Sequence, residues 1–228
     1  WQATLRDGRW ADPQPLPAPL NAPSADTDPF FSADGHWLYF ASDRGGGHGG
    51  SDLYRAPLLA DGRYGPPQNL GAAVNSRGDE RAPTLSLDGT RLLFASDGHG
   101  GMDLFVARRQ GKTFGQPTAL DGSNSADDET DAAWLGDGRA LVFARARKAH
   151  GTQLLLAQCA GGHYVQAQPL ALSFNSADGD TRGAVVDASK PTELLVVGSA
   201  RAPKAGKLDV YRMKAPVASG GGDCAGVR

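Results

Sequence analysis

Carboxylates recur in this chain at a fixed distance from asparagine. Four asparagines are each followed, five residues later, by an acidic side chain. The pairs are Asn21 and Asp26, Asn75 and Glu80, Asn124 and Glu129, and Asn175 and Asp180. Around one axis, four such charges repel one another unless a cation sits among them, and oxygen ligands favour Ca²⁺ or Mg²⁺. Equally, each carboxylate could accept backbone N–H bonds in a repeated turn. Both readings stay open, and we expect the asparagines to bond the local backbone.

Further acids and three histidines flank these positions. The acids are Asp28, Asp79, Asp128 and Asp131, and the histidines are His48 and His99, each four residues before an aspartate, and His150. Histidine together with carboxylates could bind Zn²⁺ or a similar metal. The candidate metal ligands are therefore Asp26, Glu80, Glu129, Asp180, His48, His99 and His150. Glycine-flanked histidines in loops are otherwise simply solvated.

The asparagines mark an internal repeat. The segment 21–35, NAPSADTDPFFSADG, recurs without gaps at 75–89, 124–138 and, in weaker form, 175–189. A short apolar run follows each copy, for example WLYFAS from Trp37, and a third strand such as DLYRAPL follows a Gly-rich loop. A fourth strand opens with glycine and an aromatic residue. Four short strands in about 50 residues form the blade of a β-propeller.

The composition agrees with an all-β fold. Glycine (31) and proline (15) make up about one residue in five of the 228, so long uninterrupted helices are excluded. The blade units run over about 21–70, 75–120, 124–170 and 175–214. The last unit lacks a fourth strand, whereas the N-terminus supplies a spare one at 8–16. We therefore predict a four-bladed propeller of antiparallel blades over 1–217, closed by N-terminal strand pairing into the C-terminal blade, and a flexible Gly-rich tail at 218–228.

Four aromatic residues recur in the fourth strands, at Trp10, Tyr64, Phe114 and Tyr164, and this position predicts packing between blades. The net charge of −2 supports no nucleic-acid partner, and no apolar run is long enough to span a membrane. Cys159 and Cys224 could form one disulfide or remain two free thiols. The chain begins at Trp1, so we expect that a signal peptide has been removed.

The repeats resemble the TolB-like, Pro-Asp type of WD-like propeller repeat of bacterial envelope proteins. The resemblance rests on DPFFSADGHWLYFASDR from Asp28, APTLSLDGTRLLFASDG from Ala82 and the strands that begin at Asp52 and Asp103. The GGGHGGSDLY loop looks most like the repeats that precede the peptidoglycan-binding domain of some OmpA-like proteins. The resemblance implies a propeller in a periplasmic or secreted protein. Within the family, functions range from protein scaffolding to carbohydrate enzymes, so the fold does not choose among them.

We therefore predict a non-enzymatic, monomeric scaffold that binds a protein or peptide partner of the cell envelope at the loop-rich top face. Its floor would comprise Asp26, Glu80, Glu129 and Asp180, and its rim His48, His99 and Tyr54. Two alternatives remain. One is a carbohydrate-active enzyme or lectin that uses the same carboxylates on a glycan. The other is a structural propeller with a divalent cation at the channel mouth.

Overall fold

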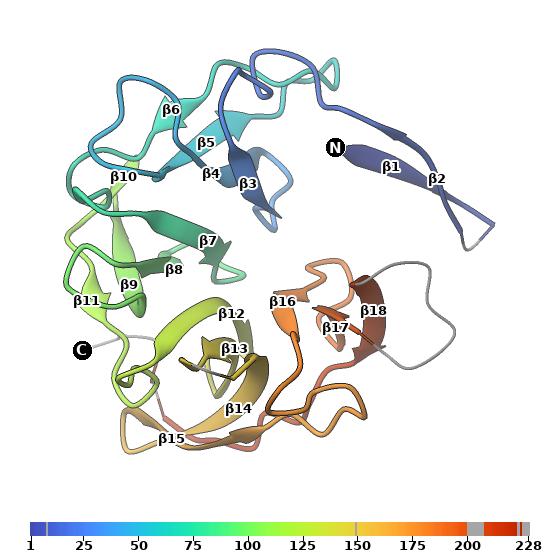
Figure 1. Ribbon diagram of the computed structural model, residues 1–228. Coiled ribbons are helices and arrows are strands. Elements are labelled where there is room, and N and C mark those ends of the chain that lie inside the picture. Colours follow the sequence, from blue (N-terminus) through green and yellow to red (C-terminus); the bar gives the residue numbers. More distant parts are fainter. Residues whose placement is uncertain (8, 149, 200–207, 223, 225–228) are drawn as a thin grey trace.

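The computed structural model describes residues 1–7, 9–148, 150–199, 208–222 and 224. Within those ranges the chain is all-β and contains no helix. Four antiparallel sheets follow one another around a central axis as the four blades of a propeller (Figure 1). The predicted fold class is confirmed. Residues 200–207 of the fourth unit, and 223 and 225–228 of the expected tail, lie outside the described residues.

Each blade runs from an innermost strand at the axis to an outer strand. Blade 1 contains β3 (Asp26–Phe31), β4 (Trp37–Ser42), β5 (Asp52–Pro57) and β6 (Gln68–Asn69). Blade 2 contains β7 (Glu80–Leu85), β8 (Arg91–Ser96), β9 (Asp103–Gln110), β10 (Thr113–Phe114) and β11 (Thr118–Ala119). Blade 3 contains β12 (Asp128–Leu135), β13 (Ala140–Ala146), β14 (Thr152–Ala160) and β15 (His163–Pro169). Blade 4 contains β16 (Arg182–Val186), β17 (Glu193–Gly198) and β18 (Asp209–Lys214).

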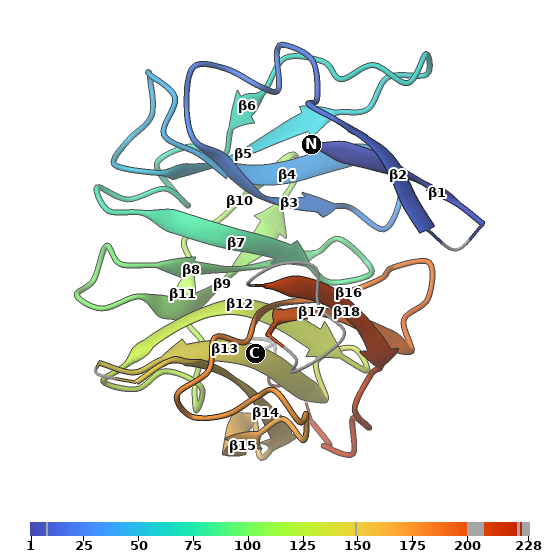
Figure 2. The ribbon, with the colours of Figure 1, turned by 45° about the vertical axis from the view of Figure 1, so that its right-hand side comes forward.

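The apolar runs of the sequence form the second strands, which are packed on both faces. β4, β8 and β13 are almost wholly buried because successive blades stack against one another (Figure 2). Leu93, Phe143 and Tyr164 belong to one cluster shared by blades 2 and 3. A strand that is covered on both faces needs a continuous apolar run rather than strict alternation. This explains why WLYFAS, RLLFAS and ALVFAR are so alike.

A bulge interrupts the pairing of every innermost strand with its neighbour. The register shifts within β3, β7, β12 and β16, and one residue in each bulge has a left-handed backbone. These residues are Asp28 (φ 53°), Ala82 (φ 50°), Asp131 (φ 49°) and Gly183 (φ 67°). Bulges redirect side chains and are common beside functional sites. Here they determine the direction in which the side chains near the start of each innermost strand point.

The ring closure differs from the expected one. The N-terminal strand β2 (Arg9–Gln14) pairs with β1 (Gln2–Arg6) in a separate hairpin (Figure 1). Within the described ranges, β18 pairs only with β17, so blade 4 has three strands. Trp10 consequently lies 65 % exposed, whereas Phe114 and Tyr164 are buried as predicted. β1 supplies a local partner that sequence comparison with the other blades did not reveal.

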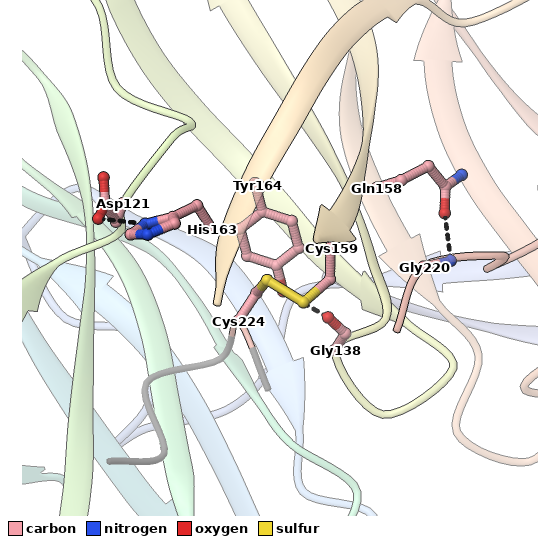
Figure 3. Close-up of a disulfide and its surroundings, with 8 residues drawn as sticks. All are labelled: Asp121, Gly138, Gln158, Cys159, His163, Tyr164, Gly220 and Cys224. Carbon is pink, nitrogen blue, oxygen red and sulfur yellow. Dashed lines mark hydrogen bonds and ion pairs between the residues drawn. A yellow bond between two sulfur atoms is a disulfide. The ribbon is translucent and has the colours of Figure 1, made fainter. Parts of the chain in front are cut away.

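The C-terminal segment is attached to blade 3. Cys159 in β14 and Cys224 form a disulfide, with Cα atoms 5.6 Å apart, which answers the question that the sequence left open (Figure 3). The backbone N–H of Gly221 donates to the carbonyl of Cys159 (2.9 Å). Those of Ser219 and Gly220 donate to Gln158 Oε1 (3.0 Å each). A search of the described residues finds no helix long and apolar enough to cross a membrane.

Candidate functional site

Glu80 and Glu129 are internal caps of the turns that lead into the innermost strands. Both side chains are 0 % exposed. Glu80 accepts hydrogen bonds from the Ser76 backbone N–H (2.9 Å) and from the hydroxyls of Ser76 (2.6 Å) and Ser96 (2.7 Å). Glu129 accepts the same pair of bonds from Ser125 and an ion pair from Arg145 Nε (2.6 Å). Of the two readings of the repeated carboxylate, these contacts favour the turn requirement.

Asp26 plays a similar part in blade 1 at a more open position. It accepts hydrogen bonds from the Ser42 hydroxyl (2.6 Å) and from Arg44 Nη2 (2.6 Å). Burial opposes ionisation, but these bonds outweigh it and hold the pKa of Asp26 below its usual value. Its charge is therefore compensated within the blade.

Asp180 does not occupy the equivalent position. The backbone N–H of Glu80 donates to the carbonyl of Ser51, and that of Glu129 donates to the carbonyl of Met102. Each of these carbonyls directly precedes the third strand of the preceding blade. In blade 4 the corresponding bond runs from Thr181 to Thr152, and Thr181 is buried. The gap-free alignment of the fourth unit is thus wrong by one residue. Asp180 pairs instead with Arg182 (3.4 Å).

The other reading, a ring of four uncompensated charges, does not fit these contacts. Arg44, Arg145 and Arg182 pair with three of the carboxylates, and serine hydroxyls bind the fourth. Three of the four carboxylates thus have a basic partner within the protein. Over the described part of the chain, no three His, Cys, Asp or Glu side chains gather in a group that could hold a metal ion.

The repeat asparagines do more than shape a local turn. Asn75 Oδ1 accepts the N–H of Leu53 (2.8 Å), and its amide donates to the carbonyl of the same residue (3.1 Å). Asn124 and Asn175 make the same two bonds to Leu104 and Leu154. Each asparagine thus clamps the third strand of the preceding blade, about 20 residues away. The expectation of a bond to the local backbone did not include these contacts, although Asn175 also donates to the nearby Leu170 carbonyl (2.8 Å).

The predicted rim residues are placed differently from one another. Tyr54 is buried and stacks on Phe40, with ring centroids 5.9 Å apart, so it does not lie on the rim. His99 contacts the Phe105 ring, and His150 Nδ1 lies 3.1 Å from Asp178 Oδ1. His48 lies in the loop before β5, and its backbone N–H donates to Asp52 (2.7 Å). The structure does not bring the three histidines together as one site.

Two carboxylates that the sequence marked only as flanking acids lie in the bulges of the innermost strands β3 and β12. Asp28 Oδ2 accepts the backbone N–H of Ala82 (3.2 Å), across the step from blade 1 to blade 2. Asp131 Oδ2 accepts the N–H of Gly183 (3.0 Å), across the step from blade 3 to blade 4. Burial raises the pKa of Asp131, and the nearby Asp28 charge raises it further. The two acids therefore share one electrostatic environment.

Blades 2 and 4 each carry an arginine directly before the left-handed residue of the bulge. Arg182 opposes the rise in the pKa of Asp131, and Asp28 contributes to raising the pKa of Arg81, whose hydrogen bond to Asp79 is the larger cause. Acidic and basic groups thus alternate from blade 1 to blade 4. We call Asp28, Arg81, Asp131 and Arg182 the channel charges. This arrangement can recognise a ligand that carries charge and hydrogen-bonding groups.

Comparison with known proteins gives a fold but no sequence family. No family model matches the chain. Its structure resembles TolB from Acinetobacter baumannii (16 % identity, TM-score 0.57), over 86 % of this chain and 42 % of that one. It also resembles a putative TolB from Agrobacterium tumefaciens (16 % identity, TM-score 0.56), over 85 % of this chain and 62 % of that one. An endo-arabinase from Bacteroides thetaiotaomicron is similar as well (18 % identity, TM-score 0.53), over 81 % of this chain and 72 % of that one. The fold is a TolB-like β-propeller.

This TolB-like propeller spans less than two thirds of the length of either TolB chain. At 16–18 % identity the likeness shows the architecture alone, and the arabinase shares that architecture too. The finer resemblance to OmpA-like proteins stays a prediction. Function must therefore be argued from the channel charges and the loops around them.

The raised pKa of Asp131 predicts a pH dependence of stability. The folded TolB-like propeller holds the Asp131 proton more tightly than the unfolded chain, so stability falls as the pH rises from the ordinary carboxyl pKa through the raised one. Asp131→Asn keeps an acceptor for Gly183 and removes this loss. We expect its urea midpoint to exceed that of the wild type more at pH 7 than at pH 4.

Asp88→Asn is a control of opposite sign. Hydrogen bonds from Ser86 and Thr90 outweigh burial and hold the pKa of Asp88 at about 2. Its ionised form therefore stabilises the fold above the ordinary pKa, and this stabilisation is lost as the pH falls toward about 2. Removing the charge should lower the midpoint at pH 7. Equal pH profiles for the two variants would contradict the assignment.

Proposed function

We propose that this protein is a non-enzymatic scaffold of the cell envelope or secreted space that binds a protein or peptide at its loop-rich face. This face comprises the loops after the second strands and the connections between blades. The observation that carries the proposal is the set of channel charges near the start of the innermost strands. Asp28 and Asp131 take the place of the buried acidic caps as the floor of the site.

The loops of this face are already joined to one another. Gly50 donates to the Gly78 carbonyl (2.9 Å) and Ser51 to Asp79 (2.7 Å), which links blade 1 to blade 2. The N–H of Met102 donates to Asp128 (3.2 Å) and that of Gly151 to the Ala177 carbonyl (3.1 Å), which links the later blades. A preorganised surface loses less conformational entropy on binding than a mobile one.

One glycine is needed for this close contact between loops. A Cβ on Gly49 would lie 2.5 Å from the carbonyl carbon of Arg77 and 2.6 Å from the Gly78 oxygen. Both atoms belong to the backbone, so neither can move aside easily. The Gly-rich loops therefore serve close packing between blades and help to keep the binding face in one shape.

The two acids among the channel charges favour basic groups on a partner. Each of Asp28 and Asp131 uses one oxygen for a backbone N–H of the next blade, and burial together with the Asp28 charge raises the pKa of Asp131. A lysine or arginine side chain near both acids would stabilise the charged forms. Complementary charge of this kind chiefly supports specificity and rapid association.

A periplasmic or secreted location is consistent with the disulfide. Disulfides persist in oxidising compartments and are rare in the cytosol. Cys159 and Cys224 account for all cysteines of the chain, and both are used in the bridge. This supports a partner from the cell envelope, which the TolB-like fold also suggests.

The test is affinity capture from an envelope extract, with partners identified by mass spectrometry. We expect the wild type to retain a partner that the Asp28→Asn/Asp131→Asn variant retains at least about tenfold less well, the equivalent of about 1.4 kcal/mol. Asp61→Asn, an exposed acid between β5 and β6, is the matched control and should behave as the wild type. Equal retention by all three proteins would rule out the channel acids as the binding site.

The same two acids favour a second candidate, a glycan-cleaving or glycan-binding protein. Glycoside hydrolysis uses a pair of carboxyl groups, one of which has a raised pKa, and Asp131, whose pKa is raised in part by the Asp28 charge, offers such a pair with Asp28. Incubation with a panel of bacterial and plant oligosaccharides separates the two proposals. Hydrolysis that is lost in Asp131→Asn would support the enzyme.

A further inference from the structure

The N-terminal segment carries the sequence of an outer strand that blade 4 lacks. Residues 8–16, GRWADPQPL, match residues 62–70, GRYGPPQNL, with Trp10 at the position of Tyr64. The third strands match as well, because DVYRMK of β18 corresponds to DLYRAP of β5. In blade 1, Gln68 lies opposite Arg55, and Arg55 Nε donates to its side chain (3.3 Å). The same alignment places Gln14 opposite Arg212.

The exposure of Val210 in β18 marks the side of blade 4 that lacks a neighbouring blade. Val210 lies in the third strand of blade 4, opposite Val197 of the second strand. Leu53, Leu104 and Leu154 occupy the same register position in the third strands of blades 1 to 3, so they are its counterparts. The three leucines are 0 % exposed, whereas Val210 is 68 % exposed. Each of the three leucines packs in a cluster shared with the next blade, so the equivalent site is covered in three blades and open to solvent where blade 4 faces blade 1.

The outer segment makes the same backbone contact with the third strand in the three complete blades. The N–H of Leu70, Leu120 and Leu170 donates to the carbonyl of Leu53, Leu104 and Leu154, respectively, at 2.8–3.0 Å. Their counterpart in the N-terminal segment is Leu16. It already packs beside Leu20, Leu38 and Phe40 in the cluster of blade 1. Leu16 thus already packs against blade 1, whereas its backbone contact with Val210 of blade 4 is not formed.

The two matching strands border one groove. Trp10 of β2 lines a cavity of ≈ 370 Å³ together with Leu195, Val210 and Arg212 of blade 4. β2 uses one edge for β1, which leaves its other edge for a further strand. Pairing with β18 therefore does not require the hairpin to open. It would cover Trp10 and Val210, and removal of this apolar surface from water favours the paired state.

We infer that the ring has two states, the open one, in which β2 pairs only with β1 and blade 4 has three strands, and a closed one, in which β2 also pairs with β18 and completes blade 4. The junction between blades 1 and 4 is then a gate in the side of the propeller. This conformational step goes beyond the proposed binding function, and it does not depend on the identity of the partner.

Distances between nitroxide labels test this inference. One label pair is placed at Gln14→Cys and Lys214→Cys, across the junction. The matched pair is placed at Gln68→Cys and Pro57→Cys, the equivalent positions of the paired strands β5 and β6. We expect the junction pair to show a short-distance population that coincides with that of the matched pair, beside a longer one from the open ring.

Two substitutions make the result decisive. Val210→Asp should abolish the short population because it places a charge in the covered site, and Val210 is exposed in the open ring, so folding is preserved. Val217→Asp changes a valine of similar exposure (76 %) outside the groove and should leave the distribution unchanged. A single long distance in the wild type, or a short population that survives Val210→Asp, would overturn the inference.

Discussion

Replacing both cysteines, in Cys159→Ser/Cys224→Ser, is expected to lower the free energy of unfolding by about 4 kcal/mol. The disulfide joins residues 65 positions apart and therefore closes a long loop in the unfolded chain. Chain entropy for a loop of this length gives a stabilisation of about 4 kcal/mol, within the usual range of about 2–5 kcal/mol for native disulfides. Urea unfolding of the purified proteins measures the difference.

The double substitution avoids a free thiol that could pair with another chain. The wild type measured under a thiol reductant in unfolding conditions should match the variant, because both lack the bridge. A loss below about 0.5 kcal/mol, the usual effect of a surface substitution, would contradict a stabilising role for the bridge. Such a result would also weaken the argument for an oxidising compartment.

Arg145→Met is expected to destabilise the fold by about 3–5 kcal/mol. Arg145 Nε lies 2.6 Å from Glu129, whose side chain is fully buried, and Arg145 Nη2 donates to the Ser123 carbonyl (2.9 Å). Methionine keeps much of the side-chain volume but leaves the Glu129 charge without its counter-ion. Breaking a buried pair in this way typically costs about that amount. Thermal and urea unfolding provide the measurement.

Arg147→Met is the matched control two residues further along the chain. Its guanidinium lies 4.0 Å from Asp127, and both side chains are substantially exposed. Exposed pairs contribute about 0–1 kcal/mol. Similar losses for the two arginine variants would show that the buried cap of the third blade is not specially dependent on Arg145.

The blades could be predicted from sequence because each repeat carries its own local signals. The Ser-x-Asp-Gly turns, such as Ser86–Gly89, and the apolar runs after them specify a hairpin without reference to the rest of the chain. In the structure the Ser86 hydroxyl bonds Asp88 (2.5 Å), and the Asp88 carboxylate accepts the N–H of Thr90 (3.0 Å). Local hydrogen bonds thus fix the register that the repeat shows.

The remaining features depend on contacts that a repeat alignment does not contain. The one-residue slip at Asp180 becomes visible only through the bond from Thr181 to Thr152. Tyr54 lies two residues after the polar Asp52, on the same face of β5, yet it is buried in the core of blade 1. The role of Asp28 and Asp131 depends on the bulges, which turn these side chains toward the next blade. The sequence identified them only as acids that flank the repeated carboxylate.

The salt dependence of partner binding tests the proposed site most directly. The affinity of the captured partner is measured for the wild type and for Asp28→Asn/Asp131→Asn at about 50 and 200 mM salt, across which screening of exposed charges changes strongly. If the channel acids bind basic groups, the wild type loses affinity as salt rises, and the variant binds more weakly with a flatter dependence. Equal affinities and equal salt slopes for both proteins would contradict a charged binding site at the channel.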